Sequence, residues 1–282
     1  MREVLEAALR AEARGERAAL VTVVATEGST PQKAGARMLV HADGRIEGTI
    51  GGGCLEAEMT WRAREAIEGR RPKLVSYDLT PDQAGEDGLV CGGRMQVFIE
   101  PIEGTPVLCL FGAGHVAQPL ARMAKACGFR VELADDRVKF ANTERFPEAD
   151  LIVVDAFPAA ASKMTLGPTS YAIVVTRGHK GDADALQAVL GRGVRFVGLL
   201  GSRPKVVHIF AALQERGVSA EDLAGVHAPL GLEIGAQNPD EIAVSILAEM
   251  IAVRRGVDPA QSRSMRMDLP GRLSPGRRSD TT

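Results

Sequence analysis

The sequence predicts an α/β protein in which an N-terminal α+β domain precedes a Rossmann-like, doubly wound parallel sheet. Buried-strand patterns alternate with helical patterns through the second half, but not through the first. A glycine-rich turn follows the first strand of the second half, and PIEGTP, with two prolines and a glycine, separates the halves. We therefore place the two domains at 1–100 and 107–256, a linker at 101–106 and a disordered tail at 257–282.

The composition is typical of a globular protein. The 282 residues are 45% hydrophobic and 25% charged, with a formal net charge of −2, which gives no basic surface for nucleic acid. No apolar run is long enough for a membrane span. Residues 1–16 have a charged amphipathic pattern rather than that of a signal peptide. The four cysteines form no C-x-x-C pair, so we expect reduced thiols and a cytoplasmic location.

The elements of the first half follow from hydrophobic spacing and turn residues. Apolar positions three and four apart predict helices, and β-branched runs predict strands. The predicted elements are a helix at 3–14, a strand at 18–26, a hairpin of 36–41 and 45–50, a helix at 54–69, and strands at 73–80 and 94–100.

Residues 107–137 carry the most specific local motif. A strand at 107–111 leads into Gly112-Ala113-Gly114-His115-Val116-Ala117, which fits G-x-G-x-x-G/A at the start of a helix. Gly112 permits the tight turn, and Gly114 lets a phosphate approach the helix start. A second strand ends at Asp135, where an acidic residue can bind a ribose hydroxyl. Alone, the motif indicates an NAD(P)-dependent dehydrogenase; the alternative is a tight turn without a ligand.

The rest of the second half continues the alternation. The predicted strands are at 151–155, 172–176 and 196–200, and the predicted helices at 182–190, at 204–216 and from a capping box at Asn238. His179 lies in TRGHKGD directly after a strand, where ligands bind in such sheets. His115 lies in the glycine turn itself. The alternative for His179 is an ordinary polar loop capped by Asp182.

Two cysteines lie in glycine-rich loops. A triple glycine precedes Cys54 at a predicted helix start, which favours the thiolate that acts as nucleophile or metal ligand. Cys91 is followed by two glycines. Two such thiols facing one pocket would suit a soft metal, and the alternative is a pair of small buried side chains. Cys109 and Cys127 lie at apolar positions and are expected in the core.

Seven segments together resemble the xanthine dehydrogenase accessory protein family, XdhC/CoxI. The resemblance covers almost the whole chain, from about Ala18 to Arg255. The segments are ATEGSTPQKAGARM, GTIGGGCLEAE, CGGRMQVFIEP, LFGAGHVAQPLARMA, VTRGHKGDADAL, GLLGSRPK and HAPLGLEIGAQNPDEIAVSILAEM.

The resemblance implies a chaperone of the molybdenum cofactor rather than an enzyme. Such proteins bind molybdopterin, as the mononucleotide or in a dinucleotide form, protect it and support its sulfuration with a cysteine desulfurase. They deliver it to a xanthine dehydrogenase-type molybdoenzyme, and they are usually homodimers. The resemblance places molybdenum ligation at Cys54 and Cys91, and further cofactor contacts at Gly112, Gly114 and Asp135. An NAD(P)-dependent oxidoreductase and a nucleotide-binding regulatory module remain open alternatives.

Overall fold

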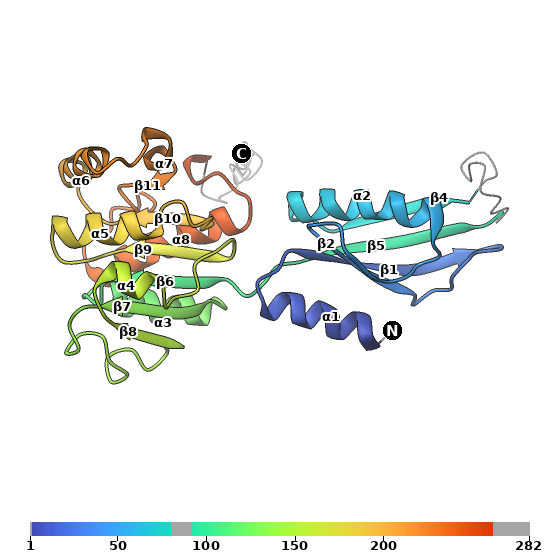
Figure 1. Cartoon of the computed structure of the whole chain (residues 1–282), viewed down its shortest axis with the longest axis horizontal. Coiled ribbons are helices and arrows are strands. Elements are labelled where there is room, and N and C mark those ends of the chain that lie inside the picture. Colours follow the sequence, from blue (N-terminus) through green and yellow to red (C-terminus); the bar gives the residue numbers. More distant parts are fainter. Residues whose placement is uncertain (1, 80–91, 262–282) are drawn as a thin grey trace, which may run out of the picture.

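The computed structural model describes residues 2–79 and 92–261, which form two sheets. Figure 1 shows these sheets towards opposite ends of the long axis. We call residues 2–102 the antiparallel unit, 107–261 the parallel unit and 103–106 the connector. The last strand of the antiparallel unit extends to Ile102, so the connector is shorter than the predicted linker. We propose that the two units are separate domains.

The antiparallel unit confirms the predicted α+β class. Its elements are α1 (Arg2–Ala13), β1 (Ala18–Glu27), β2 (Arg37–His41), β3 (Ile46–Gly48), α2 (Gly53–Gly69), β4 (Lys73–Asp78) and β5 (Arg94–Ile102), with strand order β3-β2-β1-β5-β4. Helix α2 packs Leu55, Met59 and Ala63 on one face of the sheet. Helix α1 packs Val4 and Ala8 on the other face. Both stripes follow the helical spacing seen in the sequence.

The parallel unit is a doubly wound sheet, as predicted. Its elements are β6 (Val107–Phe111), α3 (Ala117–Ala126), β7 (Arg130–Asp135), β8 (Leu151–Val154), α4 (Phe157–Ala161), β9 (Ser170–Val174), α5 (His179–Val189), β10 (Phe196–Leu199), α6 (Arg203–Glu215), α7 (Ala220–Ala224), β11 (Val226–His227), α8 (Pro239–Arg254) and a 3-10 turn at Pro259–Gln261. The order β11-β10-β9-β6-β7-β8 places the topological switch point between β6 and β9. Helices α3 and α8 cover one face, and α4 to α7 cover the other.

Some local predictions differ from the structure. The short elements α4, α7 and β11 were not predicted, because two to five residues carry too little periodicity to be recognised. Cys127 was predicted to lie in the core, but it is exposed because α3 ends at Ala126 and Cys127 is its C-cap. The capping box at the start of α8 is confirmed: the Asn238 side chain accepts from the Glu241 N–H at 2.9 Å. Residues 262–282 of the predicted tail lie outside the described residues.

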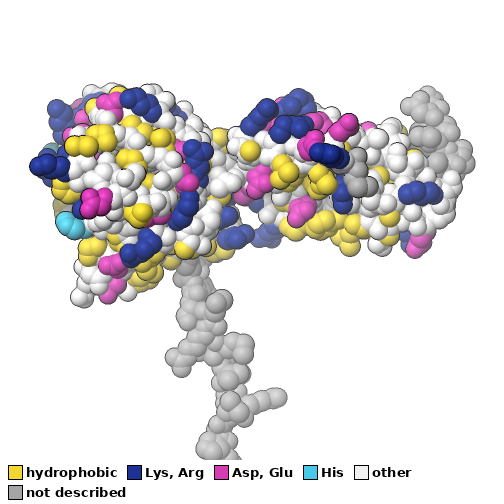
Figure 2. Space-filling view, turned by 90° about the horizontal axis from the view of Figure 1, so that it is seen from below, with side chains coloured by type: hydrophobic (Ala, Val, Ile, Leu, Met, Phe, Trp, Pro, Cys, Tyr) yellow, Lys and Arg dark blue, Asp and Glu magenta, His cyan; other side chains and the backbone are white. Residues whose placement is uncertain are grey.

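The surface carries charges of both signs. Figure 2 shows Lys and Arg side chains interspersed with Asp and Glu on the face in view. Within residues 2–79 and 92–261, no helix has the length and apolarity that a membrane span requires.

Candidate functional site

Three consecutive glycines turn the chain into α2. Gly51, Gly52 and Gly53 all have positive φ, at 140°, 75° and 57°, which side-chain-bearing residues rarely adopt. A Cβ at Gly51 would lie 2.5 Å from the Pro31 ring, whereas a Cβ at Gly52 would meet nothing within 4 Å. The turn is therefore packed against the loop at Pro31 and open over Gly52.

The carboxylate of Glu56 fills the inside of this turn. Its Oε1 accepts from the N–H groups of Ile50 at 3.0 Å and Gly52 at 2.9 Å, and from the Thr49 hydroxyl. Burial raises the pKa of Glu56, but these hydrogen bonds to the charged form outweigh burial, so the pKa lies below its ordinary value. The Glu56 carboxylate therefore neutralises the N–H groups inside the turn and holds the turn in one conformation next to Cys54.

Replacing Glu56 by glutamine is expected to destabilise the fold by about 1–2 kcal/mol at pH 7, because an amide loses the charge-assisted bonds from the turn. The lowered pKa means that this contribution is present above the ordinary glutamate pKa of 4.5 and is lost as the pH falls through the folded-state pKa. Urea unfolding at pH 7 and in the acid range measures both effects. Glu58→Gln is the control, since Glu58 forms an ion pair with Arg62 on the same helix and does not bond to the glycine turn. An equal loss in both variants would contradict the prediction.

Cys54 is exposed at the start of α2. Burial raises the pKa of Tyr77 on β4, and the charges of Cys54 and Glu58 raise it further. Cys109, in contrast, is buried in β6 as predicted, and burial raises the pKa of its thiol. Cys91 lies outside the described residues, so its pairing with Cys54 remains a prediction.

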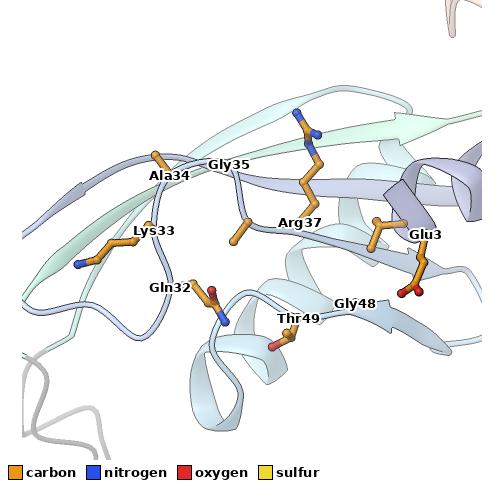
Figure 3. Close-up of a pocket in the computed structure, with 10 residues that line it drawn as sticks. Glu3, Gln32, Lys33, Ala34, Gly35, Arg37, Gly48 and Thr49 are labelled. Carbon is orange, nitrogen blue, oxygen red and sulfur yellow. The ribbon is translucent and has the colours of Figure 1, made fainter. Parts of the chain in front are cut away.

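A cavity of 470 Å³ lies beside the same turn (Figure 3). Figure 3 shows that its lining comes from the loop before β2, from Thr49 after β3 and from Glu3 at the start of α1. Lys33, Arg37 and the acidic Glu3 are its charged lining residues, and Figure 3 shows the Lys33 and Arg37 side chains extending in different directions. Thr49 also donates to Glu56. The cavity and the glycine turn therefore meet at Thr49.

The second glycine turn lies at the end of β6. Gly112 has φ 111°, and a Cβ there would lie 2.6 Å from the Val175 carbonyl oxygen. Gly114 faces open space, since a Cβ there would meet nothing within 4 Å. His115 follows it and is exposed. Gly112 therefore keeps β6 and the end of β9 in contact, whereas Gly114 leaves the backbone accessible to a ligand.

Asp135 is fully engaged with its own chain. Its carboxylate accepts from the Ala113 N–H at 2.8 Å, inside the glycine turn, and from the Arg137 N–H and guanidinium. Burial raises the pKa of Asp135, but the Arg137 guanidinium and the two N–H groups hold it below its ordinary value. Asp135 stabilises the turn in this structure, and its contact with a ribose remains a prediction.

A cavity of 290 Å³ lies at the carboxyl edge of the parallel sheet. The loops after β7, β8 and β9 line it, with Asp135, Phe157, Arg177 and Lys180 among the lining residues. This is the edge at which ligands bind in doubly wound sheets. Its volume lies at the lower end of the ~300–1,000 Å³ of ordinary small-molecule pockets.

Sequence reasoning missed a buried ion pair beside this edge. Asp182 in α5 is fully buried, and its carboxylate lies 2.6 Å from Lys205 Nζ in α6 and accepts from the Thr176 hydroxyl at 2.7 Å. Asp182 lies in TRGHKGD after β9, and Lys205 lies in GSRPK after β10. Because both segments follow parallel strands, the sequence could have predicted that they lie at the same edge of the sheet. His179 is the first residue of α5, and its ring packs edge-to-face with that of His208 in α6, with ring centroids 5.0 Å apart.

The two candidate sites lie far apart in one chain. Arg70, at the end of α2, pairs with Glu103 of the connector, so the start of α2 points away from the connector. The connector enters β6 at its amino end, which puts the carboxyl edge on the opposite side of the parallel unit. The lengths of α2 and β6 alone come to about 40 Å. Cys54 therefore does not share one site with Gly112, Gly114, Asp135 or His179 of the same chain.

Comparison with known proteins gives three curated relatives. An uncharacterised Escherichia coli protein, YqeB, is 38% identical over 84% of this chain, although the chain spans only 43% of that relative. A protein of Bacillus subtilis described as a probable xanthine dehydrogenase subunit is 27% identical over 86% of this chain and 94% of its own length. The molybdenum cofactor insertion chaperone PaoD of Escherichia coli is 26% identical over 90% of this chain and 88% of its own length.

Two family models match the two units. The model described as the XdhC Rossmann domain matches residues 108–250, just over half of the chain and nearly all of the parallel unit. The model described as the XdhC and CoxI family matches residues 11–78, which carry the glycine turn and Cys54. The chain therefore belongs to the XdhC and CoxI family.

Proposed function

We propose that this protein is a molybdenum cofactor-binding chaperone that protects the cofactor, supports its sulfuration and delivers it to a xanthine dehydrogenase-type molybdoenzyme. The observation that carries this proposal is the exposed Cys54 thiol at an open glycine turn, next to a cavity lined in part by Lys33 and Arg37. The name of the chaperone PaoD supports the same role, because the two chains align over most of their lengths.

The residues of the antiparallel unit fit one end of the cofactor. Molybdenum accepts soft thiolate ligands, and Cys54 presents such a donor at the surface. Lys33 and Arg37 suit the phosphate group of a pterin. Cys91 is the second proposed thiol. Its support comes from the segment 28–31, which runs close to both glycine loops: a Cβ at Gly28 would lie 3.3 Å from the Gly92 carbonyl oxygen, and a Cβ at Gly51 would lie 2.5 Å from the Pro31 ring.

The parallel unit fits a phosphate or nucleotide. Gly114 leaves the start of α3 open, and Arg177 and Lys180 line the 290 Å³ cavity at the same edge of the sheet. When bound, the cofactor supplies the molybdenum centre on which the target enzyme depends, and this chain supplies thiol and phosphate contacts. His115 and His179, both exposed at this edge, are proposed to contact the bound group.

The distance between the two sites has a consequence for the assembly. One cofactor molecule does not reach across about 40 Å within one chain. We propose a homodimer in which two chains run in opposite directions, so that Cys54 of one chain faces the parallel unit of the other. A cysteine desulfurase and the recipient molybdoenzyme are the proposed transient partners of this dimer.

The proposal is tested by mass spectrometry of small molecules that co-purify with the natural chain from molybdenum-replete cells under anaerobic, reducing conditions. Molybdopterin or its dinucleotide is the expected ligand. Addition of the loaded protein to a cofactor-free molybdenum hydroxylase is expected to restore activity. Absence of any pterin, together with no reconstitution, would remove the proposal, and bound NAD(P) with hydride transfer would support the oxidoreductase alternative instead.

The role of the thiols is tested by single variants. Cys54→Ala is expected to lower the amount of retained cofactor at least about tenfold, because a metal–thiolate bond is lost. Cys91→Ala is expected to act in the same direction. Cys127→Ala is the matched control, since Cys127 is also an exposed, unpaired thiol but lies at the end of α3. Unchanged retention in Cys54→Ala, Cys91→Ala and the double variant would disprove thiol ligation and leave phosphate binding standing.

A further inference from the structure

Helix α2 is an outer layer of the antiparallel unit (Figure 1). One side of the helix packs Leu55, Met59 and Ala63 on the sheet. The opposite side carries residues at alternating spacings of three and four, which align in one stripe along a helix. These residues are all exposed, and we call them the outer face of α2: Cys54, Ala57, Trp61, Arg64 and Glu68. The outer face therefore runs without interruption from the first turn of α2 to the last.

Trp61 lies at the middle of this outer face. It is the single tryptophan of the chain, and it is 55% exposed. The Arg62 guanidinium lies 5.8 Å from the centroid of its ring and leaves the rest of the ring open. Tryptophan loses much hydrophobic free energy when it is left in water, and it is the residue most typical of the anchors of protein interfaces. Trp61 is therefore placed as an interface anchor rather than as a core residue.

The charges beside Trp61 are complementary to those of a second copy of α2 that runs in the opposite direction. Glu58 lies three positions before Trp61 and Arg64 three positions after it. With Trp61 at a two-fold axis, Glu58 of each copy faces Arg64 of the other, whereas parallel helices would place like charges together. Within residues 2–79 and 92–261, no carboxylate lies at ion-pair distance from Arg64, whose Nη2 donates to the Asp43 carbonyl at 3.3 Å. The Arg64 charge is thus available to a partner.

We propose that the outer face of α2 binds the same face of a second copy of this chain, with the two Trp61 rings packed together at the two-fold axis. The inference rests on the homodimer of the proposed function and names its surface. Helix α2 has 17 residues and is about 25 Å long. The antiparallel contact places Cys54 of one copy beside Glu68, at the connector end of the partner's helix. Cys54 is thereby brought towards the partner's parallel unit, because Arg70 at that end pairs with Glu103 of the connector.

Sedimentation equilibrium of the full chain, combined with the fluorescence of its single tryptophan, tests the anchor. The natural chain is expected to dimerise, and the emission of Trp61 is expected to move to shorter wavelength with rising concentration, because the ring leaves water. Trp61→Ala is expected to raise the dissociation constant about 100-fold or more, since each dimer loses two anchors. Leu74→Ala is the matched control: Leu74 is 66% exposed, but it alternates with the buried Val75 on β4 and so points away from α2. Its dimerisation is expected to equal that of the natural chain.

Charge reversal tests the antiparallel orientation. Glu58→Lys places a cation against the partner's Arg64 twice in each dimer, and it is expected to weaken dimerisation about tenfold or more at low salt. Arg64→Glu is expected to act in the same direction, because it faces the partner's Glu58. The double variant restores opposite charges across the axis and is expected to recover most of the affinity. Residues six apart do not face each other on one helix, so this rescue reports a contact between copies.

The outcomes separate this surface from the rest of the proposed function. A natural chain that stays monomeric at millimolar concentration would remove the homodimer and this inference together, whereas pterin retention is measured independently. A dimer whose dissociation constant is unchanged in Trp61→Ala, or is not rescued in the double charge variant, would overturn the inference alone. An intact dimer in Trp61→Ala with lost delivery to the molybdenum hydroxylase would assign the outer face of α2 to the recipient enzyme, which also overturns it.

Discussion

Replacing Gly112 by alanine is expected to destabilise the parallel unit by about 3 kcal/mol or more. The φ of 111° is strained for any residue with a Cβ. The added Cβ would also lie 2.6 Å from the oxygen and 2.8 Å from the carbon of the Val175 carbonyl group. Backbone atoms do not move aside as a flexible side chain does, so β6 and the end of β9 would have to separate. Urea unfolding of the full chain, followed by circular dichroism, measures the loss.

Gly114→Ala is the matched control two residues further along. A Cβ at Gly114 would meet nothing within 4 Å, and its φ is not in the positive range, so the stability is expected to change by no more than about 0.5 kcal/mol. The same variant is expected to lower the affinity for a phosphate-containing ligand, because Gly114 borders the proposed phosphate contact. Equal destabilisation by both substitutions would show that the contact with Val175 does not set the requirement for glycine. Unchanged stability and affinity in Gly114→Ala would argue against a ligand at this turn.

Replacing Lys205 by methionine is expected to destabilise the chain by about 3–5 kcal/mol at pH 7, since it leaves the buried carboxylate of Asp182 without its cation. Asp182 is fully buried and lies 2.6 Å from Lys205 Nζ, so water cannot replace the lost partner easily. The remaining hydrogen bond from Thr176 does not neutralise the charge. Thermal and urea unfolding of the variant give the change in free energy.

Two further variants separate the loss of the ion pair from the loss of the lysine stem. The double variant Asp182→Asn with Lys205→Met is expected to recover most of the stability, because no uncompensated charge stays buried. Lys163→Met is the control, since Lys163 pairs with Asp155 at 2.8 Å but both side chains are solvent-accessible. If the double variant is as unstable as Lys205→Met, the packing of the lysine stem rather than its charge is responsible.

The fold was largely predictable from local patterns. The strands and helices longer than about one turn follow hydrophobic spacing, and the alternation of the second half predicts the doubly wound sheet because parallel strands need crossover helices. The missed elements α4, α7 and β11 are too short for periodicity. Cys127 was misplaced because the predicted apolar face of α3 continued one residue beyond the end of the helix.

The candidate site was predictable only in part. The sequence indicated that Cys54 lies at a helix start and that Gly112 lies in a tight turn, and both positions are as predicted. The sequence did not indicate that the carboxylates of Glu56 and Asp135 accept hydrogen bonds from backbone N–H groups of their respective glycine turns. A glycine motif specifies backbone conformation, but the hydrogen-bond partner of that backbone depends on the direction of neighbouring side chains.

The sequence by itself determined the family, the two types of sheet and the glycine positions, because each depends on residues that are close along the chain. Tertiary structure alone decided which of these features meet. It brought Asp182 to Lys205 and two arginines, Arg70 and Arg195, to Glu103 of the connector. It also placed Cys54 and the Gly112 turn at remote ends of one chain. The distance between the two sites depends on how helices and strands are arranged in space. A local sequence pattern predicts the length of α2 or β6, but it does not show that the two elements lie end to end between the sites.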